Sequence, residues 1–261
     1  MEHQERFQLA VDICGRMLET YPNELVLGGV YGSTAQGTDI ASSDLELLFV
    51  TREGCKAEGK IFIFRDTSIG YEVHQQSKLE ESVRTPSLDW PFQMGVLSVL
   101  RVLHGDPGLV QGWLRMGRAI PLEEFHSELV RLMPELIVES YGRILSCQAR
   151  GNIDDLHCSV LEVVFEMNQA LCLLNGRWVT HDYSQGFEDA CEFSKLPEAY
   201  TELVSLLWNA RGFDDVVPLA RTLVDNFWQL LRDEGVNVPN YQDVRALPLL
   251  GEQPRGAWAK G

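Results

Sequence analysis

Two acidic residues, Asp44 and Glu46, stand two positions apart at the start of an apolar run that ends at Val50. Alternate side chains of a β-strand point to the same face, so both carboxylates would share one face and the neighbouring leucines the other. Another apolar run, 25–31, ends at a Gly32-Ser33 turn, with ten residues between Ser33 and Asp44. Mg²⁺ prefers carboxylate oxygens, and the backbone N–H groups of such a turn can hold phosphate. The stretch therefore predicts a magnesium and nucleotide site.

A lone Asp-x-Glu pair is more typical of a solvated strand face, but here it occurs together with the strand, the Gly-Ser turn and the spacer, which favours function. This combination resembles the signature of the nucleotidyltransferase superfamily that includes DNA polymerase β. A closer resemblance, to the kanamycin-type aminoglycoside 4′-O-nucleotidyltransferases, runs in order along most of the chain. The segments that carry it are 29–33, 43–46, 89–91, 125–126, 137–139 and 226–228.

The resemblance implies an enzyme that transfers AMP from ATP to the 4′-hydroxyl of aminoglycosides such as kanamycin and tobramycin, and so gives antibiotic resistance. It implies Mg²⁺, with ATP, GTP or another nucleoside triphosphate as co-substrate. It also implies a homodimer with its sites at the interface, because in this family the partner subunit supplies the general base. Two alternatives stay open: a minimal nucleotidyltransferase that modifies a protein or RNA, and a member that binds nucleotide without catalysis.

The resemblance also assigns roles to individual residues. Glu72 joins the metal ligands because a hairpin over 60–74 could place it on a strand beside Asp44 and Glu46. The full set of roles is catalytic for Glu139, Asp44 and Glu46; metal binding for Asp44, Glu46 and Glu72; nucleotide binding for Gly32, Ser33, Arg143, Thr180 and His181; and substrate binding for Glu72, Glu135 and Glu139.

Glu135, Glu139 and Arg143 recur at every fourth position, so they share one face of a predicted helix. On spacing alone this is a solvated ion pair that contributes ~0.3 kcal/mol. The resemblance instead implies that Glu139 is the general base, Arg143 a phosphate contact and Glu135 a ligand for substrate amines. Two departures from the family pattern lie nearby: Gln36 replaces an arginine that contacts phosphate, and Pro134 either kinks the helix or starts its second segment.

Hydrophobic periodicity predicts an α+β N-terminal nucleotidyltransferase domain, 1–124, with a mixed sheet and flanking helices. An all-α helical-bundle C-terminal domain with an irregular tail, 125–261, would follow it. The pattern in the first domain predicts helices at 4–20, from 77, at 90–103 and at 109–116, and strands at 25–31, 44–50, 60–65 and 69–74. The pattern in the second predicts helices at 125–150, 154–175, 183–193, 197–209 and 214–234.

The 261-residue chain has 38 acidic and 22 basic residues, a formal net charge of −16. Such acidity repels nucleic acids and suits a polycationic aminoglycoside, although it also aids solubility. No apolar run reaches the ~18 residues that span a bilayer, and the polar N-terminus is unlike a signal peptide. The six cysteines form no C-x-x-C pair, which predicts buried, reduced thiols. We therefore expect a cytoplasmic protein without nucleic-acid or membrane partners.

Overall fold

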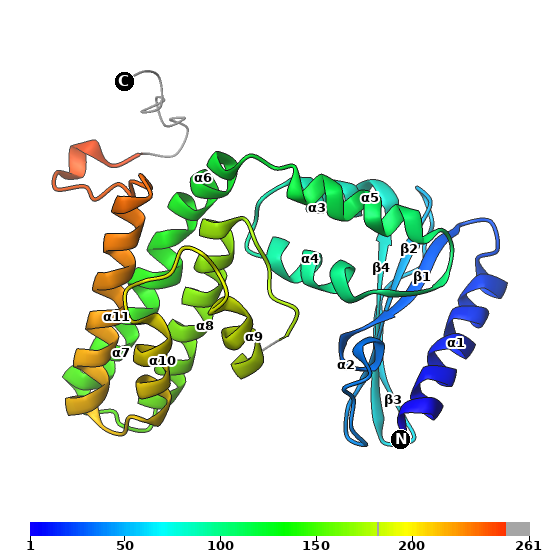
Figure 1. Cartoon of the computed structure of the whole chain (residues 1–261), viewed down its shortest axis with the longest axis horizontal. Coiled ribbons are helices and arrows are strands. Elements are labelled where there is room, and N and C mark those ends of the chain that lie inside the picture. The colour runs from blue at the N-terminus through cyan, green and yellow to red at the C-terminus, as the bar shows by residue number, and fades with distance from the viewer. Residues whose placement is uncertain (182, 249–261) are drawn as a thin grey trace.

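A mixed β-sheet lies at the centre of the N-terminal part of the chain (Figure 1). The computed structural model describes residues 1–181 and 183–248, and within them five strands form one sheet in the order β3-β4-β2-β1-β5. β2 runs antiparallel to β1 and parallel to β4, so the predicted mixed sheet is confirmed. The strands are β1 (Leu25–Tyr31), β2 (Leu45–Thr51), β3 (Lys60–Phe64), β4 (Thr67–Gln75) and β5 (Arg101–His104).

Different helices cover the two faces of this sheet (Figure 1). Leu45 and Leu47 of β2 are fully buried in a cluster with α1 (His3–Thr20). Leu48 points to the opposite face, where it belongs to the cluster that includes the other covering helices. Because alternate residues share a face, Glu46 lies on the same side as Leu48, as the sequence predicts. The helices on that side are α3 (Gln76–Arg84), α4 (Trp90–Val99) and α5 (Pro107–Arg118).

The strand β5 corrects one prediction, because a helix was expected to continue from residue 90 to residue 103. Instead α4 ends at Val99, and the next residues pair antiparallel with β1, with Gly29 opposite Val102. A Cβ atom on Gly29 would lie 2.9 Å from the carbonyl oxygen of Arg101, so glycine permits this close approach of the two backbones. The open edge of β1 supplies hydrogen-bond partners for this strand, and local hydrophobic periodicity carries no information about such distant partners.

Helices make up the regular structure of the described chain after His104. The predicted helix over 125–150 is helical throughout, but its middle part is a π-helix. The π-helix begins at Pro134, so this proline starts a second segment of the helix. Proline lacks an N–H group and its ring crowds the preceding turn, which favours such a local change in winding. The elements are α6 (Leu122–Met133), the π-helix η1 (Pro134–Glu139), α7 (Ser140–Arg150), α8 (Leu156–Asn175), α9 (Tyr183–Ala190), α10 (Tyr200–Asn209), α11 (Phe213–Asp233) and the 3₁₀ turn η2 (Val244–Ala246).

Apolar contacts continue from the sheet into these later helices. Trp90 of α4 packs edge-on against Phe125 of α6 and against Trp178, with ring centroids 4.6 and 5.8 Å apart. The same buried cluster extends from Leu27 of β1 to Val236. The domain boundary after residue 124 therefore stays a prediction, and the part of the tail at 249–261 lies outside the described residues.

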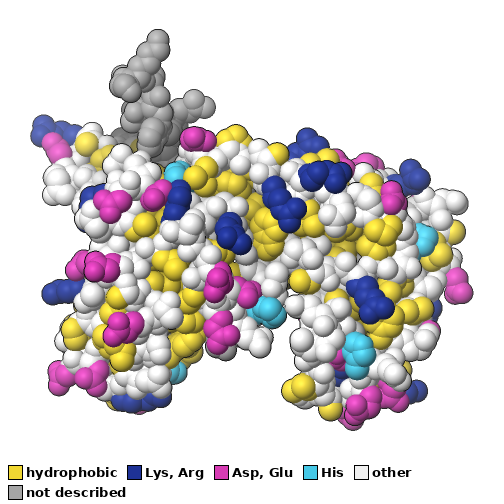
Figure 2. Space-filling model, in the orientation of Figure 1, with side chains coloured by type: hydrophobic (Ala, Val, Ile, Leu, Met, Phe, Trp, Pro, Cys, Tyr) yellow, Lys and Arg dark blue, Asp and Glu magenta, His cyan; other side chains and the backbone are white. Residues whose placement is uncertain are grey.

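Acidic side chains are spread over both the sheet and the later helices on the face shown in Figure 2, and they do not form a single patch there. All six cysteines are free thiols; most are buried, but Cys158 is exposed and Cys191 half-buried, which corrects the expectation for these two. None of the helices that the structure describes is long and apolar enough to cross a membrane.

Candidate active site

The Gly32 turn and the Glu46 carboxylate lie against each other at the end of two paired strands. Tyr31, the last residue of β1, is paired with Glu46 of β2, and Gly32 opens the short helix α2 (Gly32–Gln36) with φ of +66°. A Cβ atom on Gly32 would overlap the Glu46 carboxylate oxygen Oε2. Glycine is therefore required here both by the left-handed backbone and by the close carboxylate. The sequence prediction that places the turn beside Glu46 is confirmed.

Glu72 lies on the strand next to β2, as the predicted hairpin implied. It is paired in register with Leu48, so it shares a sheet face with Glu46. The Tyr31 hydroxyl donates a hydrogen bond to Glu72 Oε1 at 3.2 Å, and His74 Nε2 lies 3.0 Å from Glu72 Oε2. The hydrogen bond with His74 lowers the pKa of Glu72 despite partial burial, so this carboxyl stays ionised.

Tyr31 is a site residue that the sequence analysis missed. Burial raises the pKa of its phenol far above the ordinary value, and the negative charges of Glu72, Glu46 and Asp44 raise it further. All three predicted metal ligands therefore act electrostatically on one protonated hydroxyl. The period-2 pattern could have indicated Tyr31, because it falls on the same face of the sheet as Glu46.

Asp44, Glu46 and Glu72 are the predicted ligands of a metal ion. In the described part of the chain, no group of three or more His, Cys, Asp or Glu side chains is placed to hold an ion by itself. Asp44 is exposed and lies just before β2, while Glu72 is engaged by Tyr31 and His74. Mg²⁺ commonly takes only one or two carboxylates and completes its shell with water and substrate phosphates. Asp44 and Glu46 fit that pattern of hard oxygen donors, and metal binding stays a prediction.

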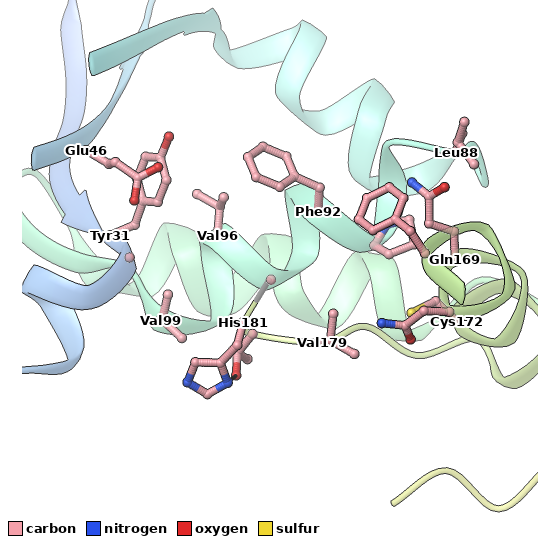
Figure 3. A pocket seen from close by; sticks show the side chains of 16 residues that line it. Tyr31, Glu46, Leu88, Phe92, Val96, Val99, Gln169, Cys172, Val179 and His181 are labelled. Carbon is pink, nitrogen blue, oxygen red and sulfur yellow. Dashed lines mark hydrogen bonds between the residues drawn. The ribbon is translucent and has the colours of Figure 1, made fainter. Parts of the chain in front are cut away.

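A cleft between α4 and α8 begins at Gly32 and Glu46 (Figure 3). The segment that follows α8 contributes Thr180 and His181 to its wall. Two sets of residues far apart in the sequence, both predicted to bind nucleotide or metal, therefore meet in one cavity. The predicted site residues that do not line this cavity are Ser33, Asp44, Glu72, Glu135, Glu139 and Arg143.

Asp189 of α9 organises Thr180 and His181. Its Oδ2 atom accepts hydrogen bonds from the Thr180 backbone N–H at 2.9 Å and from the Thr180 hydroxyl at 3.1 Å, and lies 3.0 Å from His181 Nδ1. Burial raises the pKa of Asp189, but the bonds from Thr180 and His181 outweigh it, so the pKa falls below its ordinary value. An ionised Asp189 thus orients the His181 imidazole through Nδ1. The sequence offered no signal for Asp189, because its partners depend on the fold of the α8–α9 connection.

Glu139 and Arg143 form the predicted pair on one helix face, at the junction of η1 and α7. Arg143 Nη2 lies 2.8 Å from Glu139 Oε1, and the same guanidinium also bonds Glu162 of α8. The Glu139 and Arg143 side chains are 55% and 50% exposed, and Glu135 is exposed on the same helical segment. One chain therefore presents this face to solvent and not to the cleft that contains Glu46.

Glu166 of α8 is a further unpredicted residue of this face. Its Oε2 atom is shielded from solvent and has no hydrogen-bond partner among the described residues. Burial raises its pKa to about 7, the charges of Glu162 and Glu139 add to the effect, and Ser140 and Arg143 oppose it. Nothing in the sequence pattern distinguishes Glu166 from an ordinary surface glutamate.

Comparisons with known proteins bear on the fold and on the class of protein. No family model matches the chain. Proteins named aminoglycoside nucleotidyltransferase (4′) from a Bacillus species and from Staphylococcus aureus are each 22% identical over 241 residues, which cover 89% of this chain and 91% of theirs. These names support a nucleotidyltransferase. The solved structure of a nucleotidyltransferase-like protein from Exiguobacterium sibiricum shares the fold, with a TM-score of 0.51 at 14% identity over 87% of this chain and 75% of that one.

Proposed function

We propose that this chain is a magnesium-dependent aminoglycoside 4′-O-nucleotidyltransferase that transfers AMP from ATP to the 4′-hydroxyl of the drug. The cleft is the main support, because it joins Gly32 and Glu46 from the sheet with Thr180 and His181 from the helical part. The names of the two relatives support the acceptor class and the position of the hydroxyl. The net charge of −16 suits an acceptor that carries several ammonium groups.

The residues of the cleft can hold and orient the triphosphate. Asp44 and Glu46 would hold Mg²⁺, which when bound neutralises phosphate charge and polarises the reacting phosphoryl group. Gly32 lines the same cleft, so the backbone N–H groups of the Gly32-Ser33 turn can hold phosphate there. His181, held by Asp189 through Nδ1, can donate to a phosphate oxygen from Nε2 when its ring is doubly protonated. The drug hydroxyl attacks the α-phosphorus, the bond to the bridging oxygen breaks, and pyrophosphate leaves.

The proton of the attacking hydroxyl goes to Glu139 in this proposal. Because Glu139 does not line the cleft of its own chain, we propose that it reaches the cleft of a partner subunit in a homodimer. Arg143 would accompany it as a phosphate contact and Glu135 as a ligand for a substrate amine. A protonatable base in reach of the hydroxyl typically contributes 10²–10⁴-fold, roughly, to the rate.

The test is pyrophosphate release by the purified protein with ATP, Mg²⁺ and a panel of aminoglycosides, some of which lack the 4′-hydroxyl. We expect release only with acceptors that have this hydroxyl, and mass spectrometry should place AMP on it. Asp44→Asn and Glu46→Gln should each lower turnover by roughly 100-fold or more, while the exposed helix variant Glu19→Gln should not. AMP on another hydroxyl, or normal turnover in either folded site variant, would contradict the proposal.

A further inference from the structure

At the end of the cleft that lies away from Glu46, the lining includes aromatic side chains. Phe92 of α4 is 52% exposed and Phe165 of α8 is 50% exposed, yet both line this one cavity from the two helices that bound it. Figure 3 shows Phe92 between Glu46 at one end and Gln169 at the other. Two large aromatic side chains left half-exposed across a cleft are suited to enclose a flat apolar ligand.

Two amide side chains follow Phe165 on α8. Asn168 and Gln169 of α8 both line the cavity. The Asn168 Oδ1 atom is shielded from solvent and has no hydrogen-bond partner within the described chain. A shielded carbonyl oxygen without a donor is costly unless a ligand supplies one, and a carboxamide can also donate through its nitrogen. The cavity therefore contains both hydrogen-bond donors and acceptors as well as the two aromatic rings.

The charges of the lining argue against an aminoglycoside at this end. Among the described residues that line the cavity, Glu46 is the sole carboxylate and His181 the sole basic side chain, and neither belongs to the aromatic group. A polycation would lose hydration there without gaining counter-charges. A nucleobase has faces that stack on aromatic rings and edges that pair with amides, and it carries no charge to desolvate.

We propose that the aromatic end of the cleft binds the nucleobase of the nucleoside triphosphate, between Phe92 and Phe165, with Asn168 and Gln169 bonded to its edge. This rests on the proposed function in so far as the triphosphate lies at Gly32 and Glu46. The base then contributes to affinity through stacking, and the two amides set the preference among nucleoside triphosphates.

Equilibrium binding by calorimetry tests the stacking, with ATP and inorganic tripolyphosphate as separate ligands in the presence of Mg²⁺. Phe92→Ala and Phe165→Ala should each weaken ATP binding by roughly 5- to 100-fold. Neither should change tripolyphosphate binding, because that ligand has no base. Leu161→Ala is the matched control, since Leu161 is 45% exposed on α8 but does not line the cleft. Phe92→Tyr should retain the affinity for ATP.

The amides are tested by the ratio of ATP to UTP affinity, which Asn168→Ala or Gln169→Ala should change by roughly 2- to 10-fold. Wild-type ATP binding in both alanine variants of the aromatic pair, or an equal loss of tripolyphosphate binding, would overturn the base site while leaving the transfer reaction intact. Binding of ATP that depends on the pair without transfer to any aminoglycoside would overturn the proposed function and leave the base site standing. Absence of binding by both ligands would overturn both.

Discussion

Arg6 of α1 makes a buried ion pair whose loss should destabilise the protein strongly. Its side chain is 0% exposed and pairs with Asp39, whose side chain is 1% exposed. Arg6 Nη2 also donates to the carbonyl oxygens of Met1 and Ile40, each at 2.9 Å. These bonds hold the connection between α2 and β2 that ends at Asp44. Removing one partner of such a pair leaves a buried charge and typically costs about 3–5 kcal/mol.

The variants are Arg6→Met, Asp39→Leu and the double variant, which together form a double-mutant cycle. Burial raises the pKa of Asp39, but His3 and Arg6 together hold it below its ordinary value. Without Arg6, the side-chain partner that this carboxylate keeps among the described residues is His3. We expect Arg6→Met to lower the free energy of unfolding by about 3 kcal/mol. The double variant should recover much of that loss, because replacing both partners by apolar groups removes the unpaired charge.

Urea denaturation followed by circular dichroism measures these free energies. The control is Lys78→Met, which removes an exposed pair with Glu81 and should leave the free energy of unfolding nearly unchanged. A loss below about 1 kcal/mol in Arg6→Met would refute the buried-pair reasoning. So would a double variant whose loss equals the sum of the two single losses.

Three further outcomes follow. Gly32→Ala should lose about 1–2 kcal/mol of stability from its positive φ and also lower pyrophosphate release by displacing Glu46, whereas Gly37→Ala, with φ of +72° and open space around its Cβ position, should lose stability alone. The native state keeps a proton on Glu166 up to its pKa of about 7, so the contribution of this group to stability is full below about pH 4.5 and is lost as the pH rises through 7. Glu166→Gln should therefore flatten the dependence of the free energy of unfolding on pH over that range and raise this free energy by about 1–2 kcal/mol at pH 8. An unchanged pH dependence, measured by urea denaturation, would show that the pKa of this carboxyl is not raised. Mixing Glu139→Gln with Asp44→Asn chains, with subunit exchange verified, should restore about a quarter of wild-type turnover if the base acts across a dimer, and no recovery would mean that each chain completes its own site.

The sequence determined those features that depend on local geometry. Strand alternation was enough to place Glu46 on one face and Leu45 on the other, because the side-chain period of a strand does not depend on its partners. The glycine at position 32 was evident for the same reason, since a sharp turn after a buried strand needs a backbone that other residues avoid. The spacing of Glu139 and Arg143 likewise predicted the ion pair that the helix forms.

Tertiary structure decided which of these local elements meet. The strand at Arg101–His104 exists because β1 offers an open edge, although its residues also suit the end of a helix. Asp189 orients His181 because the segment after α8 and the helix α9 lie together. The pKa of Glu166 is raised because packing excludes water from it and brings it near Glu162 and Glu139. The cleft itself requires β1, β2, α4 and α8 together. Burial and contacts between distant segments are properties of the packed chain, so no window of sequence contains them.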